Sequence, residues 1–148
     1  AGMTDEQVRA GFVFLTARQH GRPLFYSRPA GSTRENYWGN NVLGARGNDE
    51  FKHPEVVAAI AFRRAMHGRV EHVFTSRDGA VVEVARGSDG AALVNFSGKQ
   101  QRVRIDTTLP DGEYTDSVHD SKFRVRNGLL DGTLAPNASY ILYSAARK

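Results

Sequence analysis

Hydrophobic positions follow a helical spacing in the first part of the chain and an alternating spacing in the second, with the change near Gly68. The first pattern places apolar residues on one helical face: Val8, Phe12 and Leu15. Thr4 and Gln7 stand three residues apart at its start, which is the spacing of a capping box. We therefore predict a helix from residue 4 to about residue 18, with Gly21 as a left-handed cap behind it.

A second helical pattern begins at Pro54, since proline suits the first turn of a helix. The apolar residues that follow occupy several sides of this helix: Val56, Val57, Ile60, Ala61, Phe62 and Met66. We therefore expect it to be buried on more than one side. Between the two helices, a short apolar strand over residues 24–26 leads into a long polar loop over residues 28–51.

Beyond residue 69 the pattern alternates with a period of two. In the segment 101–106, Val103 and Ile105 point to one face of the strand, and Arg102 and Arg104 point to the other. The segment 122–126 shows the same division between apolar and basic positions. Turn-forming dipeptides separate such runs: Asp78-Gly79, Asp89-Gly90, Ser97-Gly98, Asp111-Gly112, Asn127-Gly128 and Asp131-Gly132. These features predict about seven or eight strands in an antiparallel Greek-key β-sandwich.

The two parts differ in whether they can bury their own apolar surface. Two packed antiparallel sheets form a core by themselves, so we expect residues 70–148 to make an independent sandwich domain. Residues 1–69 offer one strand between two helices, which leaves unpaired backbone groups on both strand edges and apolar helix faces with nothing to cover. This alternation is typical of a parallel α/β sheet, so we predict that residues 1–69 are the end of a larger domain.

The composition excludes several kinds of chemical site and partner. The chain has 148 residues and no cysteine, which excludes disulfides, thiolate catalysis and cysteine-based metal sites. Its net charge of +4 is spread over the whole length among acidic residues, so we expect no nucleic-acid partner. No stretch approaches the roughly 20 apolar residues that span a bilayer, so we expect no membrane partner either.

Several segments, in order, carry a resemblance to one enzyme family. GRPLFYSRPAG at residues 21–31 is similar to the eighth strand of the catalytic barrel of α-amylases, TDEQVRAGFVFLTAR to the seventh barrel helix and HPEVVAAIAFRRAM to the eighth. DGAVVEVARGSDGAALVNFSG and LPDGEYTD resemble the C-terminal sandwich domain of these enzymes. The resemblance implies that residues 1–69 are the last strand and flanking helices of a (β/α)8 barrel, followed by the sandwich at 70–148. It also implies a secreted enzyme that cleaves internal α-1,4-glucosidic bonds of starch with retention.

The resemblance places no catalytic residue in this chain. Retaining hydrolysis needs a carboxylate nucleophile and a carboxylic acid on opposite sides of the bond. In α-amylases these groups and a third aspartate sit on the fourth, fifth and seventh barrel strands, all of which would precede Ala1. Asp49 and Glu50 are interpreted as solvated charges near the start of the second helix. The family's calcium ligands are also expected upstream, and the five histidines lack the paired spacing of a helix-borne metal site.

The same resemblance gives candidate binding residues after the strand at 24–26. The active site of such barrels lies at the carboxyl ends of the strands, so the loop that follows would border the polysaccharide. Tyr37 and Trp38 are candidates for stacking on sugar rings, and the alternative is that both anchor the loop. Arg28 stands where some animal-type relatives bind chloride with an arginine, which makes chloride a candidate cofactor beside calcium. The expected partners are the missing N-terminal barrel portion and an α-glucan.

Two alternatives stay open at this point. One is a free-standing accessory module, in which the strand at 24–26 joins the sandwich and the aromatic loop binds carbohydrate without cleaving it. The other concerns the basic outward positions of the sandwich, which are interpreted as a solvated face, with binding of an anionic partner as the second interpretation. These positions are Arg102, Arg104, Lys122, Arg124 and Arg126.

Overall fold

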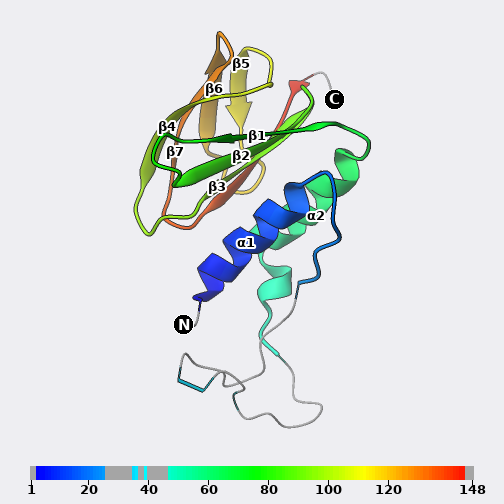
Figure 1. The fold of residues 1–148 in the computed structure, drawn as a ribbon, viewed down its shortest axis with the longest axis vertical. Coiled ribbons are helices and arrows are strands. Elements are labelled where there is room, and N and C mark those ends of the chain that lie inside the picture. Colours follow the sequence, from blue (N-terminus) through cyan, green and yellow to red (C-terminus); the bar gives the residue numbers. More distant parts are fainter. Residues whose placement is uncertain (1–2, 26–34, 37–38, 40–46, 146–148) are drawn as a thin grey trace.

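The computed structural model describes residues 3–25, 35–36, 39 and 47–145 (Figure 1). Helix α1 spans Asp5–Ala17, a short 3₁₀ helix η1 spans Glu50–Lys52, and helix α2 spans Pro54–Ala65. The predicted capping box is confirmed, because the Gln7 amide donates to the Thr4 hydroxyl and the Thr4 amide donates to the Gln7 side chain. Helix α1 ends before Gly21, however, at Arg18 in an extended conformation. No helix in the described part of the chain is long and apolar enough to cross a bilayer.

Eight strands follow the helices, in agreement with the alternating pattern: β1 (Glu71–Thr75), β2 (Val81–Arg86), β3 (Gly90–Asn95), β4 (Gln101–Asp106), β5 (Gly112–Thr115), β6 (Lys122–Arg126), β7 (Leu129–Leu134) and β8 (Ser139–Tyr143). They form two antiparallel four-stranded sheets. The first has the order β1-β2-β3-β8 and the second the order β4-β7-β6-β5.

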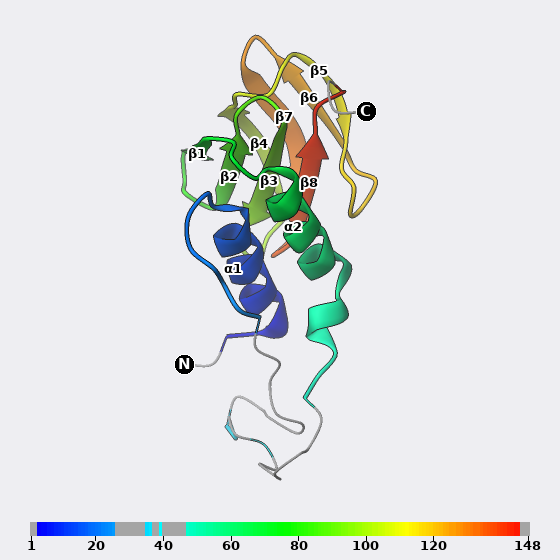
Figure 2. The same cartoon turned by 90° about the vertical axis from the view of Figure 1, so that its right-hand side faces the viewer.

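The molecule has three layers, because the helices pack on the outer face of the first sheet (Figure 2). One apolar core lies between the two sheets, and two smaller clusters lie between the helices and the first sheet. Strand β3 is buried along its whole length, since both of its faces are covered. The expectation that the helices have nothing to cover inside this chain is therefore wrong for one side of each helix.

The side of α1 that packs on the sheet is not the predicted one. Ala10, Val13 and Ala17 make the contact, and they lie on the opposite side of the helix from the predicted face. On that predicted face Leu15 is 53% exposed. The predicted face differs from the packed one because the prediction relied on large apolar side chains. Small residues such as alanine allow the helix to pack closely against the sheet.

Two further local expectations differ from the structure. Leu24 and Phe25 form no strand, and Leu24 is 92% exposed; the third residue of the predicted strand lies outside the described residues. Asp131-Gly132 lies inside β7 rather than in a turn. A side chain at Gly132 would begin 2.2 Å from the Phe123 ring, so this glycine makes room for a core aromatic residue.

Candidate functional site: the junction between the helices and the sandwich

One buried arginine on the sheet binds the ends of both helices. Arg86, at the end of β2, is 3% exposed. Its guanidinium donates to the carbonyl of Ala17 at 3.0 Å, of Met66 at 3.0 Å and of Arg69 at 2.9 Å. The first two carbonyls are at the carboxyl ends of α1 and α2, where helices leave acceptors unpaired and carry partial negative charge. A single cation therefore fixes two helices to the first sheet.

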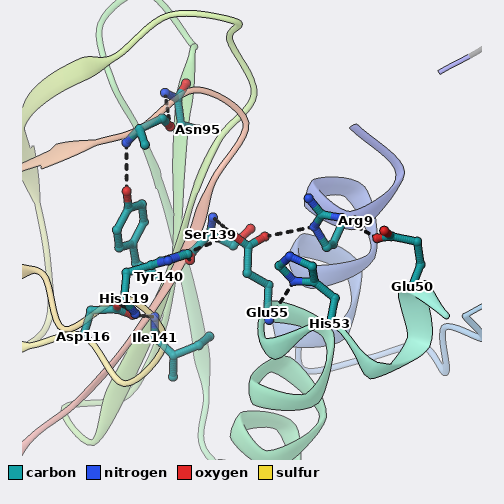
Figure 3. A network of polar contacts seen from close by, with 11 residues as sticks. Arg9, Glu50, His53, Glu55, Asn95, Asp116, His119, Ser139, Tyr140 and Ile141 are labelled. Atoms are coloured by element: carbon teal, nitrogen blue, oxygen red, sulfur yellow. Dashed lines mark hydrogen bonds and ion pairs between the residues drawn. The ribbon is translucent and has the colours of Figure 1, made fainter. Parts of the chain in front are cut away.

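The amino end of α2 is fixed by a buried carboxylate (Figure 3). Glu55 is 4% exposed, and its Oε1 accepts from the Ser139 amide at 3.2 Å and lies 3.0 Å from His119 Nε2. The same His119 nitrogen lies 3.0 Å from the Ser139 carbonyl oxygen. Because both neighbours accept hydrogen bonds, this nitrogen carries the proton. Helix α2 is thus bound to the sandwich by a cation at its carboxyl end and an anion at its amino end.

A second buried carboxylate, that of Asp116, holds the backbone at His119. Asp116 is fully buried and accepts from the His119 amide and from the Ile141 amide, the latter at 2.7 Å. The loop between β5 and β6 is therefore tied to β8 while its histidine reaches α2. In Figure 3 these residues converge from the helix, the loop and the last strand.

The amino end of α2 also contacts α1. Arg9 forms an ion pair with Glu50 and lies 3.6 Å from Glu55. His53 is the N-cap of α2, and its Nδ1 accepts from the Glu55 amide at 3.2 Å. Burial lowers the pKa of His53 below its ordinary 6.5, and the positive charge of Arg9 acts in the same direction. Both effects favour the unprotonated nitrogen that the cap requires.

The turn after α1 is held by two arginines. Arg18 forms a two-point ion pair with Glu71 of β1, at 2.9 and 2.8 Å, and its hydrogen bonds lower the pKa of Glu71 to about 2. From α2, Arg63 donates to the carbonyls of Thr16 and Arg18, at 3.1 and 3.0 Å, and to that of Gly21. These contacts hold the segment from Thr16 to Gly21 in place against α2 and β1.

The junction is built for positioning rather than for bond-breaking chemistry. Its carboxylates accept hydrogen bonds from backbone amides, histidine or arginine, and three of them tie a helix or loop to a strand: Glu55 to Ser139, Asp116 to Ile141 and Glu71 to Gln19. Across the described ranges, no three histidine or carboxylate side chains are grouped closely enough to hold a metal ion.

None of the predicted binding residues can be compared with this geometry. Arg28, Tyr37 and Trp38 all lie outside the described residues. Glu50 differs from its interpretation as a solvated charge, because it pairs with Arg9 across the helices. The junction residues Glu55, Arg86, Asp116 and His119 are not among the site residues predicted from the sequence. A signal existed for Arg86, because the alternation in β2 places it on the same face as Val84, which the helices bury.

Comparisons with known proteins find similarity to α-amylases along most of the chain. Residues 78–137 match the family model described as the bacterial α-amylase C-terminal domain. An α-amylase of Butyrivibrio fibrisolvens is 34% identical over 145 residues, which are 93% of this chain and 15% of that protein. An α-amylase of Clostridium acetobutylicum is 31% identical over 144 residues, 96% of this chain and 17% of that protein. The chain thus spans about a sixth of the length of these relatives.

A solved structure has the same fold. α-Amylase I of Eisenia fetida, determined as a mutant in complex with maltohexaose, superposes with a TM-score of 0.63 at 15% identity, over 91% of this chain and 34% of that one. With the family model on the sandwich and the relatives matching through both helices, the chain belongs to the α-amylases and is the C-terminal part of one.

Proposed function

We propose that this chain is the non-catalytic C-terminal part of a starch-degrading α-amylase, a retaining endo-hydrolase of α-1,4-glucosidic bonds. In this proposal α1 and α2 are the last two helices of a (β/α)8 barrel, and the Greek-key sandwich holds them in place. The curated relatives named as α-amylases and the maltohexaose complex of the solved neighbour support the activity. The catalytic carboxylates belong to the N-terminal portion, so the isolated chain is inactive.

The observation that carries the proposal is a second apolar side on each helix. In α2, Ala59 and Phe62 are buried in the clusters against the first sheet, whereas Val57 and Ile60 lie on another side of the helix and are 53% and 38% exposed. In α1, Leu15 is likewise exposed opposite the sheet. Barrel helices bury one side against the barrel strands. Helices that are apolar on two sides fit a position between a barrel and a sandwich.

The cofactor, location and binding-residue expectations enter as parts of the same proposal. We expect calcium to be held by residues of the N-terminal portion, chloride to be bound beside Arg28, and the complete enzyme to be extracellular. Tyr37 and Trp38 are proposed to contact the α-glucan from the loop that borders the barrel face. The resemblance of residues 21–31 to the eighth barrel strand supports these assignments.

Complementation tests the proposal. The chain and a separately produced N-terminal portion, bounded by alignment with the Butyrivibrio fibrisolvens relative, should hydrolyse starch when mixed, while each alone is inert. The double variant Leu15→Gln/Val57→Gln should weaken the association at least tenfold, because it removes apolar area from the exposed helix sides. The matched control is Val73→Gln, which alters an exposed apolar residue on β1. A stable but inactive mixture of the two parts would refute the proposal.

The accessory-module alternative predicts a different result. It requires the segment at 24–26 to pair with the sandwich, and Leu24 and Phe25 form no strand. In electrophoresis through starch-containing gels, a module would be retarded in a way that Trp38→Ala abolishes. Unretarded migration of the isolated chain supports the barrel proposal instead.

A further inference from the structure

The outer face of the second sheet, on the side away from the helices, is a shallow basic depression. It has a volume of about 760 Å³. Five basic side chains line the depression: Arg102, Arg104, Lys122, Arg124 and Arg126. We call this surface the basic face. Two acidic residues, Glu113 and Asp131, also line it, so the depression carries three more positive charges than negative ones.

Strand alternation explains why these cations gather on one surface. In β4 and β6 every second residue points into the core between the sheets, as Val103 and Phe123 do, and the residues between them point outward. All five basic residues are exposed. The two strands flank β7, so their cations approach from both sides of a single strand.

Ion pairs within the sheet neutralise only part of the positive charge on the basic face. The register places Arg104, Asp131, Arg124 and Glu113 in one row across the four strands, with alternating sign. Arg124 forms an ion pair with Glu113, and Arg102 lies 3.5 Å from Asp131. Exposed pairs of this kind contribute little to stability. The remaining cations, Arg104, Lys122 and Arg126, stand on the two strands either side of β7, so an anionic ligand would be favoured there.

The lining indicates the class of ligand. Arginine presents a planar fork that binds carboxylate or sulfate at two points. All lining residues belong to the described part of the chain, and the one aromatic among them, Phe123, is buried. A face without exposed aromatic rings is poorly suited to stacking on neutral sugars or on nucleic-acid bases. We propose that the basic face binds an anionic polysaccharide that carries carboxylate or sulfate groups along its length.

Binding of the intact chain to dextran sulfate, measured by calorimetry at two salt concentrations, tests this proposal. Neutral dextran of equal length should not bind, and polygalacturonate distinguishes carboxylate from sulfate recognition. The triple variant Arg104→Gln/Lys122→Gln/Arg126→Gln should lose at least tenfold in affinity. The control Arg22→Gln/Arg64→Gln/Lys99→Gln makes the same charge change at exposed positions outside the depression and should change affinity less than threefold.

A variant that is expected to bind more tightly keeps the proposal testable if the triple variant does not fold. Glu113→Gln removes a competing anion from an exposed position and should tighten binding to dextran sulfate. The proposal is overturned if dextran sulfate does not bind, if both triple variants lose affinity equally, or if duplex DNA binds more tightly than dextran sulfate at equal charge concentration.

Discussion

At the scale of single residues, Glu83 is a core carboxyl group with only one of its two oxygens hydrogen-bonded. It is fully buried on β2, and one carboxyl oxygen accepts from the Thr107 hydroxyl at 2.6 Å while the other has no partner among the described residues. Burial raises the pKa of Glu83 to about 7, and the charge of Asp106 adds to this shift. The sandwich therefore contains a carboxyl group that favours the protonated form.

This raised pKa makes stability depend on pH. Because the folded pKa lies above the ordinary 4.5, the folded chain binds the proton more tightly than the unfolded chain. Stability is thus greatest below pH 4.5 with respect to this group, and it is lost as the pH rises through 7. We predict that Glu83→Gln stabilises the chain by about 3 kcal/mol at pH 8, and that the gain disappears near pH 4.

Urea unfolding of the variant and the parent chain between pH 4 and 8 checks this prediction. Glu113→Gln changes an exposed carboxylate of the same type and should leave the pH profile unaltered. A stabilisation by Glu83→Gln that is equal at all pH values would show that the buried charge is not the cause.

At the scale of elements, the polar contacts at both ends of α2 decide where the helices lie. Arg86 donates three hydrogen bonds to carbonyls at or near the ends of two helices. Replacing it with methionine keeps much of the volume but removes three hydrogen bonds and leaves only the Met66 carbonyl with its other donor, the Arg69 amide, which costs about 3 kcal/mol. We predict that Arg86→Met destabilises the chain by that amount and frees the helices before the sheets.

Hydrogen exchange followed by mass spectrometry separates these effects. Amides of α1 and α2 should lose protection in Arg86→Met, while those of β6 and β7 keep it. Arg86→Lys should recover only part of the protection, because an ammonium group lacks the fork that reaches three carbonyls. Equal loss in all elements would argue against a local role for Arg86. Arg124→Met, on the exposed face, serves as the control.

At the scale of the whole molecule, the helices and the sandwich share apolar contacts. Val84, Ala92 and Ile141 on the first sheet are buried by residues of both helices. We therefore predict one cooperative thermal transition for the intact chain. A fragment of residues 70–148 should unfold at a lower temperature and bind a hydrophobic dye, because this outer sheet face becomes exposed.

Calorimetry of the intact chain and the fragment decides between this prediction and an independent sandwich. The control is the fragment with Val84→Thr and Ile141→Thr, which should bind less dye because its outer face is more polar. Two separate transitions in the intact chain, one of them at the midpoint of the fragment, would contradict the shared core.

Short-range signals along the chain were enough to predict several elements. Alternation with a period of two and glycine-containing turns indicated the strands of the sandwich, and the Thr4–Gln7 pair marked the start of α1. These features depend on residues a few positions apart, so no distant contact is needed to recognise them. The resemblance of consecutive segments to α-amylases identified the family for the same reason.

Long-range packing sets which helix sides are buried and how the helices meet the sandwich. Arg86 and Ala17 are 69 positions apart, and Glu55 and Ser139 are 84 apart. Nothing in the local pattern of either partner indicates such a contact. The register of β4, β7 and β6 likewise brought distant arginines onto one surface. Contacts between distant segments depend on how whole elements pack, and a pattern along the chain does not record that packing.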